Sequence, residues 1–169
     1  MNAMKEILVE KVTFNVGCGT DQKKLDKAIL LLKNLTKSKP VKTFTTKRIP
    51  EFNLRPGLPI GVKVTLRKAQ ATNILGPLLE AKDNVLKQNN FDENGNVAFG
   101  IAEYIDIPTL KYDPEIGIIG LQACITLIRK GFKIKNRKRI QRKVGKDHKI
   151  KKQEAIEFMK EKFKIRVEE

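Results

Sequence analysis

Residues 59–67 read PIGVKVTLR, and this alternation constrains the fold more than any other segment of the chain. Side chains on a β-strand point alternately to the two faces of a sheet. In a strand over 59–68, one face would be apolar and would suit a core: Ile60, Val62, Val64 and Leu66. The opposite face would carry Gly61, Lys63, Thr65 and Arg67. The segment therefore predicts a sheet with one covered face and one cationic, hydroxyl-bearing face that suits phosphate oxygens.

Residues 6–16 form a second alternating segment and predict another strand of the same kind. We expect its apolar face to carry Leu8, Val12, Phe14 and Val16, with Glu10 interrupting the pattern. Its other face would carry Lys11, Thr13 and Asn15. Two strands with matching polar faces favour one continuous polar surface on the sheet.

The remaining elements follow from apolar spacing and from turn residues. Strands are predicted over 41–47, 97–105 and 121–129, and helices over 21–37, 72–88 and 152–163. Within 72–88 we favour a helix start near Gly76, because Pro77 fits the first turn of a helix better than its interior. The fold class is α+β: two layers, with a mostly antiparallel sheet of four to five strands. Helices would cover one face and leave the other face open for RNA.

The net charge of +16 is concentrated in two blocks of the chain. Residues 37–68 carry nine cations and one carboxylate, residues 129–152 carry thirteen and one, and residues 69–128 are acidic. A polyanion, nucleic acid first, is the partner that such patches suit. An anionic membrane is the weaker alternative, since the longest nearly apolar stretch, residues 116–125, is too short to span a bilayer. A cytoplasmic protein without a membrane partner is expected.

We expect residues 1–128 to form an α/β RNA-binding core. Residues 129–169 would be a basic extension and a terminal helix packed on the same domain. The alternative for residues 133–149 is a solvated, disordered tail. The cations of the extension are candidates for phosphate contacts with a nucleic acid: Lys133, Lys135, Arg137, Lys138, Arg139, Arg142 and Lys143.

Catalytic chemistry has little support in the sequence. His148 is the single histidine, and the two cysteines, Cys18 and Cys124, suggest small buried hydrophobes rather than a metal or disulfide framework. Gly17 and Gly19 flank Cys18 between a strand and a helix, but the third glycine of a dinucleotide loop is absent. We therefore predict no enzyme, no metal and no cofactor. An RNA-modifying enzyme or a non-ribosomal RNA-binding protein remains the alternative.

Several segments, in order, resemble a known family. They are VTFNVG at 12–17, the Lys39–Pro40 turn, FNLRPGLPIGVKVTLR at 52–67, FDENGN at 91–96, and the residues around 112–120. The chain resembles universal ribosomal protein five of the large subunit, a 5S-rRNA-binding family, in its archaeal and eukaryotic branch. The similarity covers roughly residues 6–128. It implies a structural ribosomal protein in the cytoplasm that binds 5S rRNA and 23S rRNA in the central protuberance.

The resemblance also implies residue roles. Asn15 and Thr65 match family positions that contact 5S rRNA, and Ser38 stands where many members have glutamine. With the polar face, the 5S rRNA set is Lys11, Thr13, Asn15, Ser38, Lys63, Thr65 and Arg67. The loop over 45–58 corresponds to the family loop that reaches the P-site tRNA, with Lys47, Arg48, Phe52, Arg55 and Gly57 as candidates. Neighbouring 5S-binding ribosomal proteins and a possible bridge to the small subunit complete the expected partners.

Overall fold

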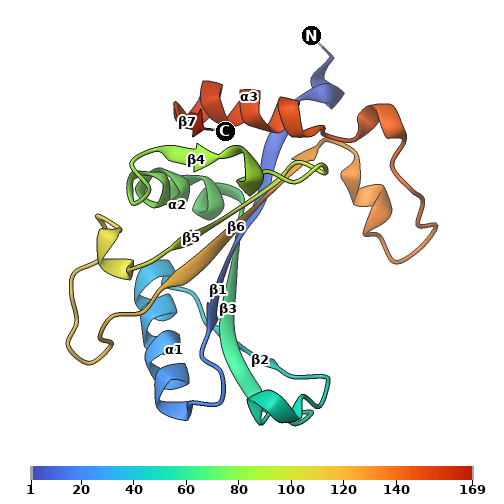
Figure 1. The fold of residues 1–169 in the computed structure, drawn as a ribbon. Helices are drawn as coiled ribbons and strands as arrows, with labels where there is room; N and C mark the ends of the chain where they lie inside the picture. The colour runs from blue at the N-terminus through green and yellow to red at the C-terminus, as the bar shows by residue number, and fades with distance from the viewer. Residues whose placement is uncertain (1, 169) are drawn as a thin grey trace.

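Residues 2–168 are described by a computed structural model, in which a five-stranded sheet forms the centre of the molecule (Figure 1). The strand order is β2-β3-β1-β6-β5, and every neighbouring pair is antiparallel. The strands are β1 Ile7–Gly17, β2 Val41–Phe44, β3 Pro59–Arg67, β5 Asn96–Ile101 and β6 Leu121–Arg129. The predicted fold class, an α+β protein with a mostly antiparallel sheet, is confirmed.

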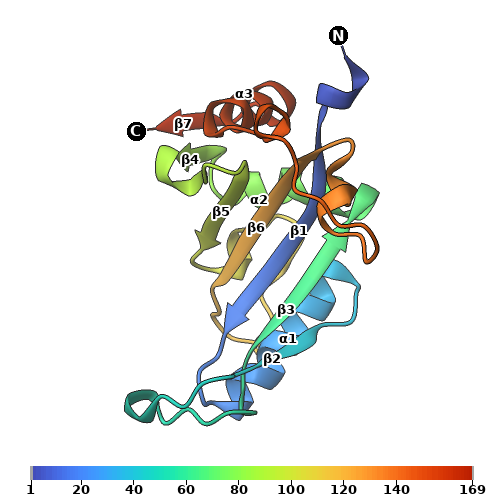
Figure 2. The ribbon, with the colours of Figure 1, turned by 90° about the vertical axis from the view of Figure 1, so that its right-hand side faces the viewer.

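Helices α1 Gln22–Thr36 and α2 Lys68–Glu80 cover the same face of this sheet (Figures 1 and 2). The Asp21 side chain caps α1 by accepting hydrogen bonds from the backbone N–H groups of Lys23 and Lys24. A third helix, α3 Lys152–Phe163, lies across the end of the sheet near the N-terminus. No helix within residues 2–168 is long and apolar enough to cross a membrane.

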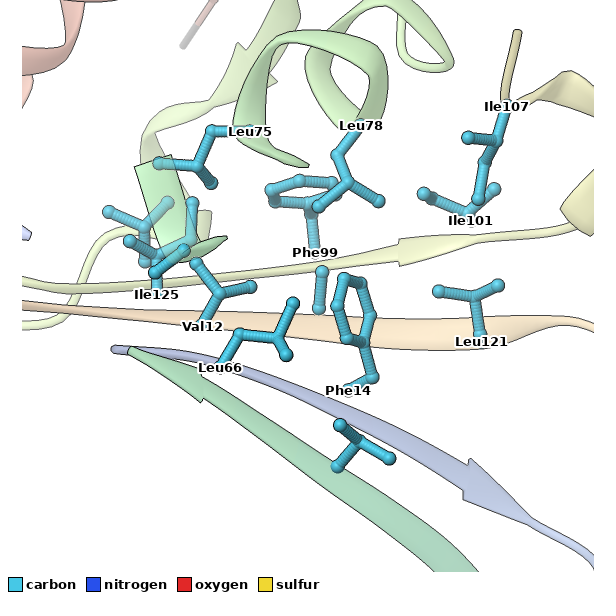
Figure 3. Packing of buried hydrophobic residues seen from close by; sticks show 14 of the residues in the cluster. Val12, Phe14, Leu66, Leu75, Leu78, Phe99, Ile101, Ile107, Leu121 and Ile125 are labelled. Atoms are coloured by element: carbon cyan, nitrogen blue, oxygen red, sulfur yellow. The ribbon is translucent and has the colours of Figure 1, made fainter. Parts of the chain in front are cut away.

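The core lies between the sheet and the helices (Figure 3). Alternate residues of the strands supply one side, including Val12, Phe14 and Leu66, and α2 supplies Leu75 and Leu78. All five side chains are at most 4 % exposed. Ala155 and Met159 of α3 belong to the same buried cluster, so α3 packs on this core.

Strand β1 differs from its predicted pattern at its first half. The register with β6 shifts between Val9 and Lys11, which marks a β-bulge. The bulge changes the phase of the strand, so that Ile7 and Val9 pack against the core. The prediction that Leu8 belongs to the apolar face is wrong for this reason: Leu8 pairs with Ile128 on the opposite side of the sheet.

Helix α2 is also placed differently from the prediction. It begins at Lys68, directly after β3, and contains Pro77 in its interior. The predicted start near Gly76 is therefore wrong, and so is the predicted end near residue 88. The helix ends at Glu80, and Asp83 and Asn84 adopt positive φ angles of 54° and 58°, which no α-helix accommodates.

The segment after α2 forms a strand that the sequence did not reveal. β4 Val85–Lys87 pairs in parallel with β7 Arg166–Glu168 in a separate two-stranded sheet. Two predicted strands are shorter than expected, since β2 ends at Phe44 and β5 ends at Ile101 before a 3₁₀ turn over Tyr104–Asp106.

Candidate nucleic-acid interface

The sheet face opposite α1 and α2 carries the polar residues of β1 and β3 in paired rows. The register places Lys11 beside Arg67, Thr13 beside Thr65, and Asn15 beside Lys63. Each pair lies on two adjacent antiparallel strands, where directly opposed side chains are about 4.5–5.5 Å apart at their Cβ atoms. Six of the seven residues predicted for 5S rRNA binding are thus brought together on one surface.

The three rows offer different chemistry. The hydroxyl oxygens Oγ1 of Thr13 and Thr65 lie 3.4 Å apart, so one hydroxyl can donate to the other. The side chains of Asn15, Lys63 and Thr65 are exposed, while Thr13 and Lys11 are half-buried. An amide and two hydroxyls can donate and accept hydrogen bonds, and a cation can neutralise a phosphate. The surface therefore suits a polyanion that also presents hydroxyl or base groups.

Arg67 has a partner that the sequence pattern did not predict. Its Nη1 atom lies 3.5 Å from Oε1 of Glu10, the residue at the β-bulge. The Arg67 side chain is 58 % exposed and that of Glu10 is 19 % exposed. Part of the Arg67 charge is thus neutralised within the protein, and Glu10 adds a carboxylate beside the polar face.

The polar face also continues onto β6, which the site prediction missed. Gln122 pairs with Asn15, Cys124 with Thr13, and Thr126 with Lys11. The alternation of residues 121–129 carried this signal, because these three residues separate the buried positions of the strand. Cys124 is half-exposed here, contrary to the prediction of a buried position, whereas Cys18 is buried. Desolvation by burial raises the pKa of both thiols.

Ser38 lies apart from the paired rows, in the turn between α1 and β2. Its hydroxyl donates to the backbone oxygen of Thr36, and its backbone N–H donates to the Thr36 hydroxyl. Ser38 is half-buried, and its local hydrogen bonds account for its position without a ligand.

The loop between β2 and β3 extends from the end of the sheet remote from α3 (Figure 2). Its candidate residues are all exposed: Lys47, Arg48, Phe52, Arg55 and Gly57. The loop nevertheless has internal backbone order, with reciprocal hydrogen bonds of 3.0 Å between Ile49 and Leu54. Phe52 is 67 % exposed, so its ring is accessible to a partner.

The basic extension is held at both ends by buried apolar side chains. Phe132 is 7 % exposed, Ile150 is 1 % exposed, and half-buried Val144 packs against the same core. All seven candidate cations between these anchors are exposed: Lys133, Lys135, Arg137, Lys138, Arg139, Arg142 and Lys143. The segment lies beside β1 and β3 on the face opposite α1 and α2 (Figures 1 and 2). Its charge therefore adds to that of the polar face.

In the described part of the chain, the candidate metal ligands and the single histidine do not form a metal or catalytic site. No three His, Cys, Asp or Glu side chains among residues 2–168 are grouped to hold a metal ion. The Nε2 atom of His148 lies 2.9 Å from the backbone oxygen of Lys130, and its ring meets that of Phe132 edge-on, so both interactions are structural.

The chain is an α+β protein with an antiparallel sheet, one helix-covered face and one basic polar face, an arrangement that suits a polyanionic partner. Comparison with known proteins defines the family. The family described as "Ribosomal protein L5" matches residues 2–55, and the model for the C-terminus of the same ribosomal family matches residues 59–158. The chain belongs to the ribosomal protein L5 family, whose members are structural ribosomal proteins of the cytoplasm rather than enzymes.

The relatives are similar along the whole chain. The large ribosomal subunit protein uL5 of Nanoarchaeum equitans is 48% identical over 165 residues, which cover 97% of this chain and 97% of that protein. That of Sulfolobus acidocaldarius is 46% identical over 166 residues, covering 98% and 93%. That of Methanosphaera stadtmanae is 40% identical over 168 residues, covering 99% and 100%. These relatives agree with the resemblance to the archaeal branch and exclude the enzyme and non-ribosomal alternatives.

Proposed function

We propose that the open sheet face binds 5S rRNA within the large ribosomal subunit. The observation that carries this proposal is the set of paired rows on β1 and β3, where cations lie beside hydroxyl and amide groups on a face without helices. On β1, β3 and β6 this face carries no aromatic side chain that could stack on splayed bases. The exposed Phe44 lies only at its edge, where β2 pairs with Pro59 of β3. The face therefore suits the backbone and 2′-hydroxyl groups of structured RNA, which proteins recognise by shape and by polar contacts.

The basic extension would bind 23S rRNA by phosphate contacts, next to the 5S rRNA. Seven exposed cations on a segment fixed at Phe132 and Ile150 provide charge at defined positions rather than on a free tail. Neighbouring 5S-binding ribosomal proteins would lie beside this RNA junction in the central protuberance, where contact with the small subunit is also proposed.

The loop over 45–58 would contact the P-site tRNA. Its exposed Phe52 can stack on a base or ribose, and Lys47, Arg48 and Arg55 can bind phosphates. Gly57 has φ of +84°, so glycine suits this turn best. Cross-linking from position 52 in ribosomes with an occupied P site tests the contact: a tRNA adduct supports it, and an adduct only to rRNA contradicts it.

Hydroxyl-radical footprinting of the purified protein on 5S rRNA tests the main proposal. We expect a compact protected region that disappears for the double variant Asn15→Ala and Lys63→Ala, while the protein stays folded. Protection that survives this variant but is lost when extension cations are replaced would place 5S rRNA on the extension instead.

A further inference from the structure

One row of side chains crosses the open face of the sheet from the edge strand β5 to β3. Gly100 of β5 pairs with Gln122 of β6, Gln122 with Asn15 of β1, and Asn15 with Lys63 of β3. All four residues are exposed. Opposed side chains on neighbouring antiparallel strands have their Cβ atoms about 4.5–5.5 Å apart. The row therefore places two amide side chains next to each other, with a cation on one side and a glycine on the other.

The two amides of this row have no hydrogen-bond partner within the described residues. The side-chain amide hydrogen bonds among residues 2–168 involve Asn2, Asn94, Asn96 and Gln141. Asn96 also lies on the open face, but its side-chain N–H donates to a carboxylate oxygen of Asp92 at 3.2 Å. Asn15 and Gln122 thus keep the donors and the acceptor of their amides free for a ligand.

The half of the open face formed by β5 and β6 carries no charged side chain. Its outward positions are neutral: Asn96, Ala98, Gly100, Gln122, Cys124 and Thr126. The cations lie on the other half, on β1 and β3, and on the extension beside these strands (Figure 2). A phosphate over β5 and β6 would have no countercharge, whereas a neutral group that both donates and accepts hydrogen bonds would suit the amides.

Gly100 leaves this half of the face open to a large ligand. A Cβ atom at Gly100 would meet nothing within 4 Å. The preceding outward residue of β5, Ala98, is exposed and ends at a methyl group. No long side chain of β5 therefore stands beside Gln122, and an RNA helix can approach its amide from that side.

We propose that Gln122 and Asn15 bind 2′-hydroxyl groups in the minor groove of the RNA, so that this row distinguishes RNA from a chain without these groups. This inference rests on the proposed binding of 5S rRNA to the open face. The 2′-hydroxyl is both a donor and an acceptor, and the wide, shallow minor groove of double-stranded RNA displays it. A side-chain amide matches it in both roles, while Lys63, farther along the row, binds a phosphate at the margin of the groove.

Interference mapping with 2′-deoxy nucleotides tests this proposal. Transcripts of 5S rRNA with single 2′-hydroxyls replaced at random are divided into protein-bound and free fractions, and the substituted positions are read in each. The wild-type protein should show a few positions where the loss of the hydroxyl weakens binding. For Gln122→Leu at least one of these positions should lose its effect, because the contact is already absent. Identical interference patterns for the two proteins would overturn the proposal.

Affinity and salt dependence provide a second measurement on the same variant. Gln122→Leu should bind unmodified 5S rRNA about 3- to 10-fold more weakly. The slope of log affinity against log salt should not change, because no phosphate contact is lost. Gln22→Leu is the matched control, since Gln22 is exposed on α1 at the other face of the sheet, and it should keep the wild-type affinity and interference pattern. A lower slope for Gln122→Leu would contradict a contact with a neutral group.

Gly100→Val tests whether the RNA covers β5. The new side chain has open space, so the melting temperature should not fall, but the chain should bind 5S rRNA at least about fivefold more weakly because the valine stands beside the Gln122 amide. Wild-type affinity in this variant would contradict the proposal. Loss of binding by the Asn15→Ala and Lys63→Ala variant, with an unaltered interference pattern for Gln122→Leu, would keep the RNA surface and refute this inference alone. Wild-type binding by that double variant would refute the proposed function itself.

Discussion

Thr13 and Thr65 face each other across β1 and β3 with their hydroxyl oxygens 3.4 Å apart, at the centre of the open face. Replacing Thr65 by valine keeps the shape and the strand preference but removes the hydroxyl. One lost hydrogen bond to RNA should weaken 5S rRNA binding about 3- to 10-fold. A filter-binding titration measures the change. Thr72→Val on α2 is the control, and it should alter neither affinity nor melting temperature; an unchanged affinity for Thr65→Val would remove this row from the site.

Glu10→Gln should strengthen RNA binding by about 2- to 5-fold. The substitution frees Arg67 from its 3.5 Å ion pair and removes a carboxylate from the edge of the polar face. Lys63→Gln should do the reverse, and it should also reduce the slope of log affinity against log salt by about 0.7–0.9. Titrations at several salt concentrations measure both variants, and weaker binding by Glu10→Gln would show that Arg67 needs its partner to bind.

Substitutions in the basic extension should separate the effect of its charge on RNA binding from the effect of its buried side chains on stability. Lys138→Gln combined with Arg139→Gln removes two exposed cations, so the salt slope of binding to 23S rRNA should fall by about 1.4–1.8 without loss of stability. Ile150→Ala removes a buried anchor and should cost about 2–4 kcal/mol in the free energy of unfolding. Urea titrations measure stability, and a negligible cost for Ile150→Ala would favour a disordered tail.

The Arg129–Glu154 ion pair should make stability depend on pH. Desolvation raises the pKa of Glu154, but the backbone N–H of Lys151 and the Arg129 guanidinium outweigh it, so the net pKa is lowered. A lowered pKa contributes stability above the ordinary carboxyl range, and this contribution disappears as the pH falls through the folded-state value. Glu154→Gln should cost about 1–3 kcal/mol at pH 7, since Arg129 is buried and Glu154 is partly exposed.

The difference between wild type and Glu154→Gln should be smaller at an acidic pH, below the ordinary carboxyl range, than at pH 7, because the native carboxyl loses its charge as the pH falls through its lowered pKa. Urea unfolding at both pH values measures this difference. Glu157→Gln is the control, because its exposed carboxylate forms no ion pair within residues 2–168. A cost for Glu154→Gln that is equal at both pH values would assign the effect to shape rather than charge.

Gly61 should tolerate no side chain, although its alternation phase places it on the polar face. A Cβ atom there would lie 2.7 Å from the backbone oxygen of Val16 on β1. Gly61→Ala should therefore cost about 1–3 kcal/mol by forcing the strands apart. Gly100→Ala on β5 is the matched control: a Cβ there meets nothing within 4 Å, so the substitution should be neutral or slightly stabilising. Thermal unfolding compares the two, and equal melting temperatures would contradict the close approach.

The sequence predicted those parts of the fold and site that depend on the local alternation of apolar and polar residues. Alternation placed Thr13, Asn15, Lys63 and Thr65 on one face, because strand pleating fixes side-chain direction without reference to the rest of the chain. The bulge at Glu10 was not predictable in this way, since it depends on the pairing of β1 with β6.

Helix α2 shows a second limit of predictions made from local sequence pattern. Pro77 suggested a boundary, yet packing of Leu75, Leu78 and Leu79 holds the helix through it. Val85 and Leu86 continued the apolar spacing of a helix, although the structure pairs them with a strand at the far end of the chain. Long-range pairing of this kind leaves no local signal.

The pairing of β4 with β7 also sets the timing of folding during synthesis. Val85 pairs with Arg166, about 80 residues later in the chain. At typical translation speeds, β4 would wait roughly 4 to 16 s for its partner to be made. The residues of the central sheet are all made before this closing strand exists, so β4 stays without its partner strand during this interval.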